Sequence, residues 1–122
     1  MRDRKTILVV DDEHEMIDMI RQSLEREEWR LITTTSCRQA LSILREHNAI
    51  DLLITDLFMP EMDGARLLKK GREIIPGLRA VLLTGLASDE ECIRWRRRGE
   101  TVVLKPWPEE EFVAVVTKSL AL

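Results

Sequence analysis

Three aspartates, a threonine and a lysine in this chain are of the types that together bind a divalent cation and a phosphoryl group. They are Asp11, Asp12, Asp56, Thr84 and Lys105. Carboxylates placed side by side repel one another, and a hard cation such as Mg²⁺, held by carboxylate and phosphate oxygens, removes that repulsion. A carboxylate can then act as a nucleophile and form an aspartyl phosphate. The lysine offers a point charge for phosphate, and the threonine hydroxyl offers a hydrogen bond.

These polar residues follow short apolar runs, either directly or within two residues. The runs are Ile7–Val10, Leu52–Ile54, Ala80–Leu83 and Val102–Leu104. They are continuous and rich in β-branched residues, which is typical of strands buried on both faces of a parallel sheet. The carboxyl ends of such strands meet in one crevice, where folds of this kind bind ligands. We therefore expect the five polar side chains to lie together.

The segments between the runs carry the apolar periodicity of helices. The helical faces are Met16, Ile17, Ile20 and Leu24; Cys37, Ala40, Leu41 and Leu44; Ala65, Leu67 and Leu68; and Phe112, Val113, Val116 and Leu120. A fourth helix over residues 88–98 has the weakest apolar face, and residues 29–35 suit an edge strand. Five β-α units predict an α/β doubly wound sandwich with a five-stranded parallel sheet, because a barrel of eight units needs about twice this length.

Capping residues precede several of the predicted helices. They are the capping-box pairs Ser36 with Gln39 and Ser88 with Glu91, Asp63 before the third helix, and Pro108 followed by three glutamates before the fifth.

For any one polar position, an ordinary structural role is the simpler interpretation. Aspartate at the end of a strand is often a turn residue or a helix N-cap. Asp12 would then only cap the first helix, and Lys105 would only end a loop. The combination argues otherwise, because four separate strand ends would have to carry suitable polar residues by chance. The joint pattern therefore favours the functional interpretation.

Length and charge limit the possible classes of protein. The 122 residues predict one domain spanning 1–122, and the net charge of −3 disfavours direct nucleic-acid binding, which needs a basic surface. Cys37 and Cys92 lack the spacing of a metal or disulfide framework, so we expect reduced thiols and a cytoplasmic location. The first apolar run is too short for a signal peptide or a membrane span, so we expect no membrane association.

Four motifs together resemble those of bacterial response regulator receiver domains in two-component systems. They are Val9-Val10-Asp11-Asp12-Glu13, Asp56-Leu57-Phe58-Met59-Pro60-Glu61-Met62-Asp63-Gly64, Leu83-Thr84-Gly85 and Leu104-Lys105-Pro106. The resemblance covers essentially the whole chain in order. It implies the flavodoxin-like fold of the chemotaxis response regulator, with strand order 2-1-3-4-5. It also implies a signalling domain that catalyses only its own phosphoryl transfer and hydrolysis, and no separate enzyme.

The resemblance also implies roles for the acidic residues. Asp56 would accept a phosphoryl group from a phosphohistidine on a sensor histidine kinase or phosphotransfer protein. Mg²⁺ would be the cofactor, held directly by Asp12, through water by Asp11, by Asp56 itself and by the backbone carbonyl of Phe58.

Thr84 and Lys105 would bind the transferred phosphoryl group, and the Lys105–Pro106 peptide would be cis. The chain departs from the family three residues before this lysine, where Val102 replaces the common Tyr or Phe of a rotating switch. The loop over residues 99–105 is also about one residue short. We therefore expect the fourth helix and its loops to carry the signal through an order–disorder change.

In the family, the fourth helix, fifth strand and fifth helix form the usual output surface. Arg94, Trp95 and Arg97 are candidate contacts there for an output domain or effector protein. Phosphorylation would also allow a homodimer to form. Whether an output domain follows Leu122 stays open.

Two other functions are weighed against this one. A receiver-shaped interaction module that needs no phosphorylation is favoured by Val102 and the short loop, and opposed by the intact polar set. A phosphoester-hydrolysing enzyme would need a second aspartate two residues after Asp56, where Phe58 stands, and a substrate-covering domain for which 122 residues leave no room. A P-loop nucleotide binder is excluded because the chain has no P-loop motif.

Overall fold

The computed structural model describes residues 4–25, 28–47, 49–85 and 90–121, in which strands and helices alternate throughout. The strands are β1 (Lys5–Val10), β2 (Trp29–Thr34), β3 (Leu52–Asp56), β4 (Arg79–Thr84) and β5 (Thr101–Leu104). The helices are α1 (His14–Leu24), α2 (Cys37–Glu46), α3 (Gly64–Ile74), α4 (Glu90–Arg97) and α5 (Glu109–Leu120). The predicted elements are present, but β3 includes Asp56 and β4 includes Thr84, which therefore end their strands instead of following them.

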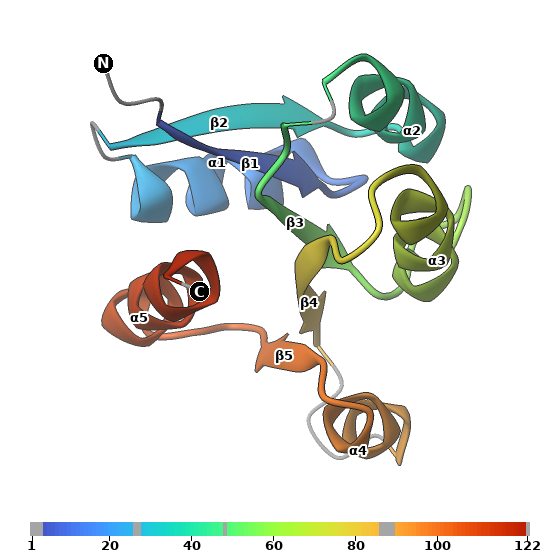
Figure 1. The fold of residues 1–122 in the computed structure, drawn as a ribbon. Helices are drawn as coiled ribbons and strands as arrows, with labels where there is room; N and C mark the ends of the chain where they lie inside the picture. The colour runs from blue at the N-terminus through green and yellow to red at the C-terminus, as the bar shows by residue number, and fades with distance from the viewer. Residues whose placement is uncertain (1–3, 26–27, 48, 86–89, 122) are drawn as a thin grey trace.

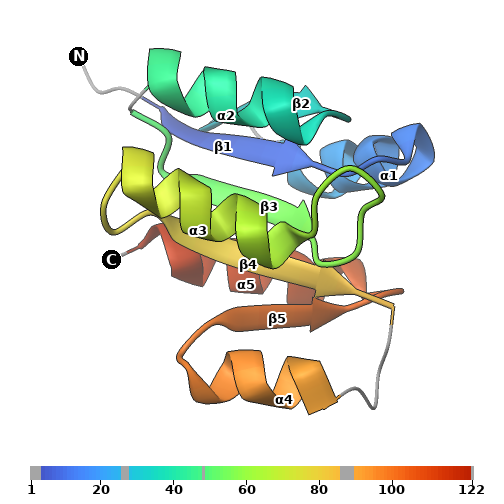
Figure 2. The ribbon, with the colours of Figure 1, turned by 90° about the vertical axis from the view of Figure 1, so that its right-hand side faces the viewer.

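All five strands join one parallel sheet in the order β2-β1-β3-β4-β5, which confirms the predicted topology. The register places Asp56 of β3 beside Leu83 of β4, and Thr84 beside Leu104 of β5. The arrowheads of the strands point the same way in Figure 2, so their C-terminal ends share one edge of the sheet. The predicted polar residues therefore lie along that edge.

Helices cover both faces of the sheet (Figure 1). The core with α1 and α5 contains Ile7 and Val9 of β1, whereas the core with α2, α3 and α4 contains Leu8 and Val10. Successive residues of a strand point to opposite faces. The apolar runs are therefore continuous because both faces of the central strands are buried.

Two predicted helix caps are confirmed. Ser36 Oγ accepts a hydrogen bond from the N–H of Gln39 at 3.1 Å, and Asp63 Oδ1 accepts one from the N–H of Arg66 at 2.7 Å. The reciprocal half of the capping box at Ser36 is wrong. The Ser36 N–H donates instead to Thr34 Oγ1 at 3.1 Å, and the Gln39 side chain also contacts that hydroxyl. The hydroxyl of Thr34, at the end of β2, thus accepts the hydrogen bond that a capping box would give to the glutamine side chain.

Pro108 holds the N-cap position of α5, and Glu109–Glu111 form the first turn, as predicted. Acidic residues at this end stabilise the helix dipole. The capping box predicted from Ser88 lies outside the described residues.

The N-cap role considered for Asp12 is wrong. Glu13 holds the N-cap position of α1 and makes no side-chain capping bond. Instead, Asp11 Oδ1 accepts a hydrogen bond from the N–H of Glu13 at 3.0 Å. The start of α1 therefore does not require the Asp12 carboxylate.

Helix α4 is the least buried of the five helices that the structure describes, as its weak apolar face predicted. Cys92 is its one residue classed as buried, whereas every other helix buries at least three. Trp95 is partly buried against the core on the α2–α3 side. Ile93, in contrast, is 48% exposed. Helix α4 is therefore held to the sheet by little apolar contact.

Within the described residues, no helix has both the length and the apolar character needed to cross a bilayer. Cys37 and Cys92 are both buried thiols, and they belong to the same core cluster.

Candidate functional site

The three aspartates predicted as metal ligands lie together at the C-terminal edge of the sheet. One carboxylate oxygen from each of Asp11, Asp12 and Asp56 lies within 4.8 Å of the other two. These residues come from the ends of β1 and β3, which are neighbours in the sheet. Asp11 is fully buried and Asp12 is exposed, so the acidic cluster of these three residues reaches solvent on the Asp12 side.

The carboxylate of Asp56 is held by two hydrogen bonds. Its Oδ1 accepts a hydrogen bond from the N–H of Phe58 at 3.0 Å, and its Oδ2 accepts one from Lys105 Nζ at 2.7 Å. Asp56 is 7% exposed. A buried carboxylate that is bonded to both a backbone donor and a cation has its orientation fixed before any reactant binds.

Lys105 enters the acidic cluster from the far end of the sequence. It directly follows β5, and its backbone N–H donates to the carbonyl of Thr84 at 2.7 Å. The Lys105–Pro106 peptide is cis, as the family resemblance implied. The ammonium also contacts Asp11 Oδ2 at 3.4 Å, so it lies between two of the three carboxylates.

Burial controls the electrostatics of these groups. Burial raises the pKa of Asp11; the backbone N–H of Glu13 and the charge of Lys105 lower it in part, and the charge of Asp56 raises it further. Burial alone would lower the pKa of Lys105, but the hydrogen bonds and charges of Asp56 and, to a smaller extent, Asp11 together outweigh that effect, and the pKa is raised. Lys105 therefore stays protonated at neutral pH, and the ionised Asp11 carboxylate is disfavoured by its surroundings.

The donor set of the acidic cluster fits a hard divalent cation. It offers three carboxylates and a single lysine charge, so one positive charge faces three negative ones when all are ionised. Oxygen ligands of this kind suit Mg²⁺, which usually binds one or two carboxylates and completes its shell with water or phosphate. A dication would also stabilise the ionised Asp11 carboxylate, which burial and the charge of Asp56 disfavour.

The remaining predicted site residues flank the acidic cluster. Thr84 ends β4, is fully buried and precedes the loop whose described part is Gly85. Phe58 turns its side chain outward, with 44% exposed, while its N–H holds Asp56. The structure thus brings Asp11, Asp12, Asp56 and Lys105 into one cluster, with Thr84 and Phe58 bordering it.

Gly64 has a role that the motif did not explain. A Cβ at this position would lie 2.1 Å from the carbonyl oxygen of Asp56 and 2.9 Å from its carbonyl carbon. The N–H of Gly64 also donates to the carbonyl of Leu57 at 2.9 Å. Helix α3 therefore begins directly against the backbone of Asp56, at a distance that only glycine permits.

Glu61 makes a hydrogen bond to a distant part of the chain that the sequence did not predict. Its Oε1 accepts the N–H of Cys37 at 2.8 Å and so joins the loop after β3 to the start of α2. Burial, together with the smaller effects of the charges of Glu61, Asp12 and Asp63, raises the pKa of the Cys37 thiol to about 11. No local pattern relates residues 37 and 61, because the contact depends on how the loop lies over the helix.

Val102 fills a core position. It is 7% exposed and belongs to the cluster that contains Cys92 and Leu82. Its carbonyl accepts a hydrogen bond from the Arg96 guanidinium at 3.0 Å, which joins α4 to β5. The place of the family's rotating aromatic ring is therefore taken by a small, packed side chain.

A family model described as the response regulator receiver domain matches residues 7–117. The response regulator SaeR of Staphylococcus aureus is 30% identical over 115 residues, which cover 93% of this chain and 50% of SaeR. The response regulator GtcR of Aneurinibacillus migulanus is 44% identical over 66 residues, which cover 54% of this chain and 27% of GtcR. The chain thus spans half the length of SaeR.

Solved structures agree with the family match. A response regulator receiver domain protein from Clostridium thermocellum superimposes with a TM-score of 0.84 at 28% identity, over 95% of this chain and 94% of that one.

Proposed function

This chain belongs to the response regulator receiver family, and we propose that its Asp56 accepts a phosphoryl group with the help of bound Mg²⁺. The observation that carries the proposal is the position of Lys105 Nζ, 2.7 Å from Asp56 Oδ2, beside two further carboxylates within 4.8 Å. Asp56 would accept the phosphoryl group and Lys105 would neutralise its charge. Asp11 and Asp12 would help to hold the metal.

The donor would be a phosphohistidine on a sensor histidine kinase or phosphotransfer protein. A carboxylate oxygen of Asp56 forms a bond to phosphorus while the phosphorus–nitrogen bond of the donor breaks. The bonding electron pair stays on the imidazole nitrogen, which then takes up a proton. Positioning and charge stabilisation supply most of the catalysis in such transfers, and the fixed orientation of Asp56 serves the first of these needs.

The metal would be held by Asp11, Asp12, Asp56 and the backbone carbonyl of Phe58. Bound there, Mg²⁺ would neutralise charge on the acceptor and on the phosphoryl oxygens. Asp12 is the exposed member of the acidic cluster and would meet an ion arriving from solvent first. Asp11 is deeply buried and would act more through its charge.

After transfer, Lys105 would lose its direct bond to the acceptor carboxylate and pair with a phosphoryl oxygen, while Thr84 would donate its hydroxyl proton to another. The backbone N–H of Lys105 donates a hydrogen bond to the carbonyl of Thr84 at 2.7 Å, so a shift of one residue would displace the other. With Val102 packed in the core, the change would pass to α4 and its preceding loop by ordering or loosening them.

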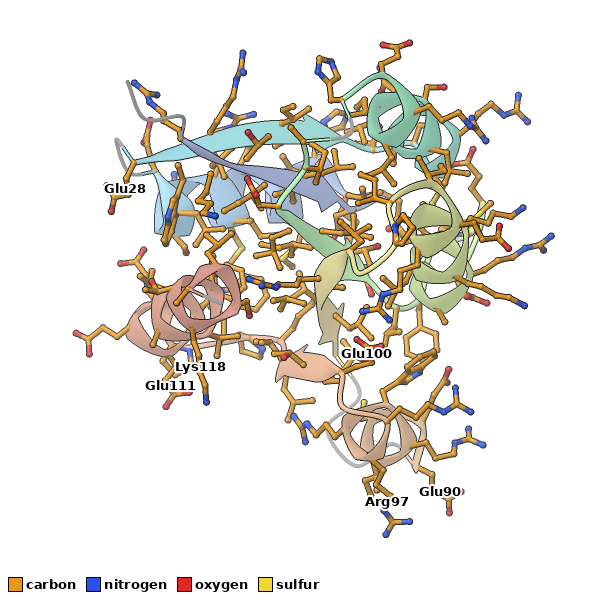
Figure 3. The ribbon with its side chains drawn as sticks, viewed as in Figure 1. Glu28, Glu90, Arg97, Glu100, Glu111 and Lys118 are labelled. Carbon is orange, nitrogen blue, oxygen red and sulfur yellow. The ribbon has the colours of Figure 1, made fainter. Side chains whose placement is uncertain are left out.

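Receiver domains of this family interact with histidine kinases and output domains. For this chain, the face made by α4, β5 and α5 is the candidate output surface, and it would also serve a phosphorylation-dependent homodimer. Arg94 and Arg97 are exposed on α4, and Figure 3 shows Arg97 pointing outward. Trp95, the third candidate, is partly buried and also lines a groove between α3 and α4.

The alternative is a phosphorylation-independent interaction module, which the packed Val102 favours. The ordered Lys105–Asp56 pair argues against it, because a buried ion pair adds little net stability and a structural role alone therefore accounts for it poorly.

The test is the intact mass of the protein after incubation with acetyl phosphate and Mg²⁺, for the wild type and for Asp56→Asn. We expect one added phosphoryl group on the wild type alone, and none when Mg²⁺ is chelated. Beryllium fluoride, a stable phosphoryl mimic, provides a second readout if hydrolysis is fast. An adduct on both proteins, or failure of both reagents on the wild type, would reject the proposal.

A further inference from the structure

A groove of about 740 Å³ runs between α3 and α4, separate from the acidic cluster. It is lined by Ala65, Arg66, Leu68, Lys69, Lys70, Arg72, Glu73, Trp95, Arg98 and Glu100. None of these residues has been given a role at the phosphoryl site. In Figure 2, α3 and α4 run in similar directions, and β4 and β5 are seen between them.

The groove contains apolar surface. Ala65 and Leu68 of α3 and the partly buried ring of Trp95 belong to one core cluster or pack against it. The guanidinium carbon of Arg98 lies 5.2 Å from the centroid of the Trp95 ring, a cation–π arrangement. An apolar side chain entering the groove would therefore meet an aromatic ring held between a packed core and a cation.

Five basic side chains and two carboxylates line the groove. One basic group is already neutralised, because Arg72 forms a two-point ion pair with Glu100 at 2.5 and 3.0 Å and also donates to the carbonyl of Leu78. Figure 3 shows Glu100 on the side of β5 that faces α3. This pair joins α3 to the start of β5 and forms a fixed wall of the groove.

The other cations of the groove keep their charge available to a partner. Arg66, Lys69 and Lys70 form no ion pair within the described part of the chain. This basic surface occurs in a chain whose net charge is −3. Charge of the opposite sign to the rest of the molecule, gathered along one groove, steers acidic partners to that place.

We propose that this groove binds an acidic amphipathic segment of a partner protein, with an apolar side chain against Trp95 and carboxylates on Arg66, Lys69 and Lys70. The apolar surface favours a peptide over a nucleic acid, whose binding is dominated by phosphate contacts. Aromatic side chains framed by cations are also common anchors of protein interfaces. The inference does not depend on phosphorylation, because no lining residue belongs to the acidic cluster.

The probe is a short fluorescein-labelled synthetic peptide, an amphipathic helix with aspartate and glutamate on one face and leucine on the other. Its matched control carries asparagine and glutamine in place of the acids. Binding is followed by fluorescence anisotropy with the whole chain. We expect the acidic peptide alone to bind, and its affinity to fall steeply between about 0.01 and 1 M salt, where the screening length shrinks from about 30 to 3 Å.

Arg66→Glu combined with Lys69→Glu should weaken peptide binding by more than about tenfold, because both side chains are exposed on the groove. Arg38→Glu combined with Lys118→Glu makes the same change of charge on exposed positions of α2 and α5 and should leave binding unchanged. Thermal melts of both double variants check that they fold.

Trp95→Phe keeps an aromatic ring and should remove any change of tryptophan fluorescence that peptide binding causes. Asp56→Asn should bind the peptide as the wild type does, so a failure of the phosphorylation proposal leaves this test intact. Equal affinity for the Arg66 and Lys69 double variant, or no binding of the acidic peptide by the wild type, would overturn the inference. So would a short DNA duplex that binds this groove where the peptide does not.

Discussion

The side chains of the acidic cluster lie at the ends of buried strands, whereas α4 has one residue classed as buried, Cys92, and a partly buried Trp95 against the core. Asp56 has both carboxylate oxygens bonded, and Lys105 joins two strand ends through its side chain and its backbone. Helix α4 exposes Ile93 and most of its charged residues. The difference indicates an acidic cluster that is already arranged and a neighbouring helix that can move at low cost.

The largest expected effect comes from the point where α3 meets Asp56. Gly64→Ala should lower the free energy of unfolding by about 1 to 3 kcal/mol or more, because its Cβ would lie 2.1 Å from a backbone oxygen that cannot rotate away. Urea denaturation measures the change.

Gly85→Ala is the matched control, since its Cβ would meet nothing within 4 Å and no positive φ is found there. Its stability should be unchanged or slightly raised. Equal losses for the two variants would show that the close approach at Gly64 is not rigid.

The second effect concerns α4. Amide exchange over residues 90–98 should be faster than in β1 and β3. When beryllium fluoride and Mg²⁺ are added, the exchange rate should change by about tenfold or more, which corresponds to about 1.4 kcal/mol in the free energy of local opening. Hydrogen exchange with mass spectrometry measures this, and Asp56→Asn serves as the unresponsive control. Unchanged exchange over these residues would reject the order–disorder account of signalling.

The third effect tests the electrostatic cost of burying the Asp11 carboxylate in the acidic cluster. Because burial disfavours the charged form of Asp11, Asp11→Asn should stabilise the metal-free protein by about 1 kcal/mol, or roughly 3 to 5 °C in melting temperature. The same variant should lose the extra stability that Mg²⁺ gives the wild type. A destabilised metal-free variant that still responds to Mg²⁺ would contradict both parts.

The smallest effect concerns Cys37. Because its folded pKa of about 11 lies above the ordinary value of 9.0, the thiol contributes stability below pH 9 that is lost as pH rises through 11. Glu61→Gln keeps the hydrogen-bond acceptor but removes the charge, so the pKa of Cys37 should fall.

The pH dependence of Cys37 alkylation by iodoacetamide, mapped by mass spectrometry, reports this shift. Glu90→Gln, which removes an exposed carboxylate from α4, should leave it unchanged. A pKa that does not move in Glu61→Gln would mean that the charge of Glu61 does not contribute to the shift.

The fold and the grouping of polar residues could be predicted because both follow from local patterns. Continuous apolar runs identify buried parallel strands, and the topology then brings Asp11, Asp56 and Lys105 to one edge. The contact of Glu61 with Cys37 could not be predicted, since it depends on the path of a loop over a helix from another part of the chain. The capping box at Ser36 failed in half for a similar reason, because the hydroxyl of Thr34 at the end of β2 supplied a nearer partner.

The most direct test of the central claim is the position of the phosphoryl group. Borohydride reduces an aspartyl phosphate to homoserine, a change that peptide mass spectrometry assigns to a single residue. After treatment with acetyl phosphate and Mg²⁺, we expect homoserine at position 56 and at no other aspartate. Reduction at Asp11 or Asp12, or an unreduced Asp56 in a protein whose intact mass carries the phosphoryl group, would contradict the account.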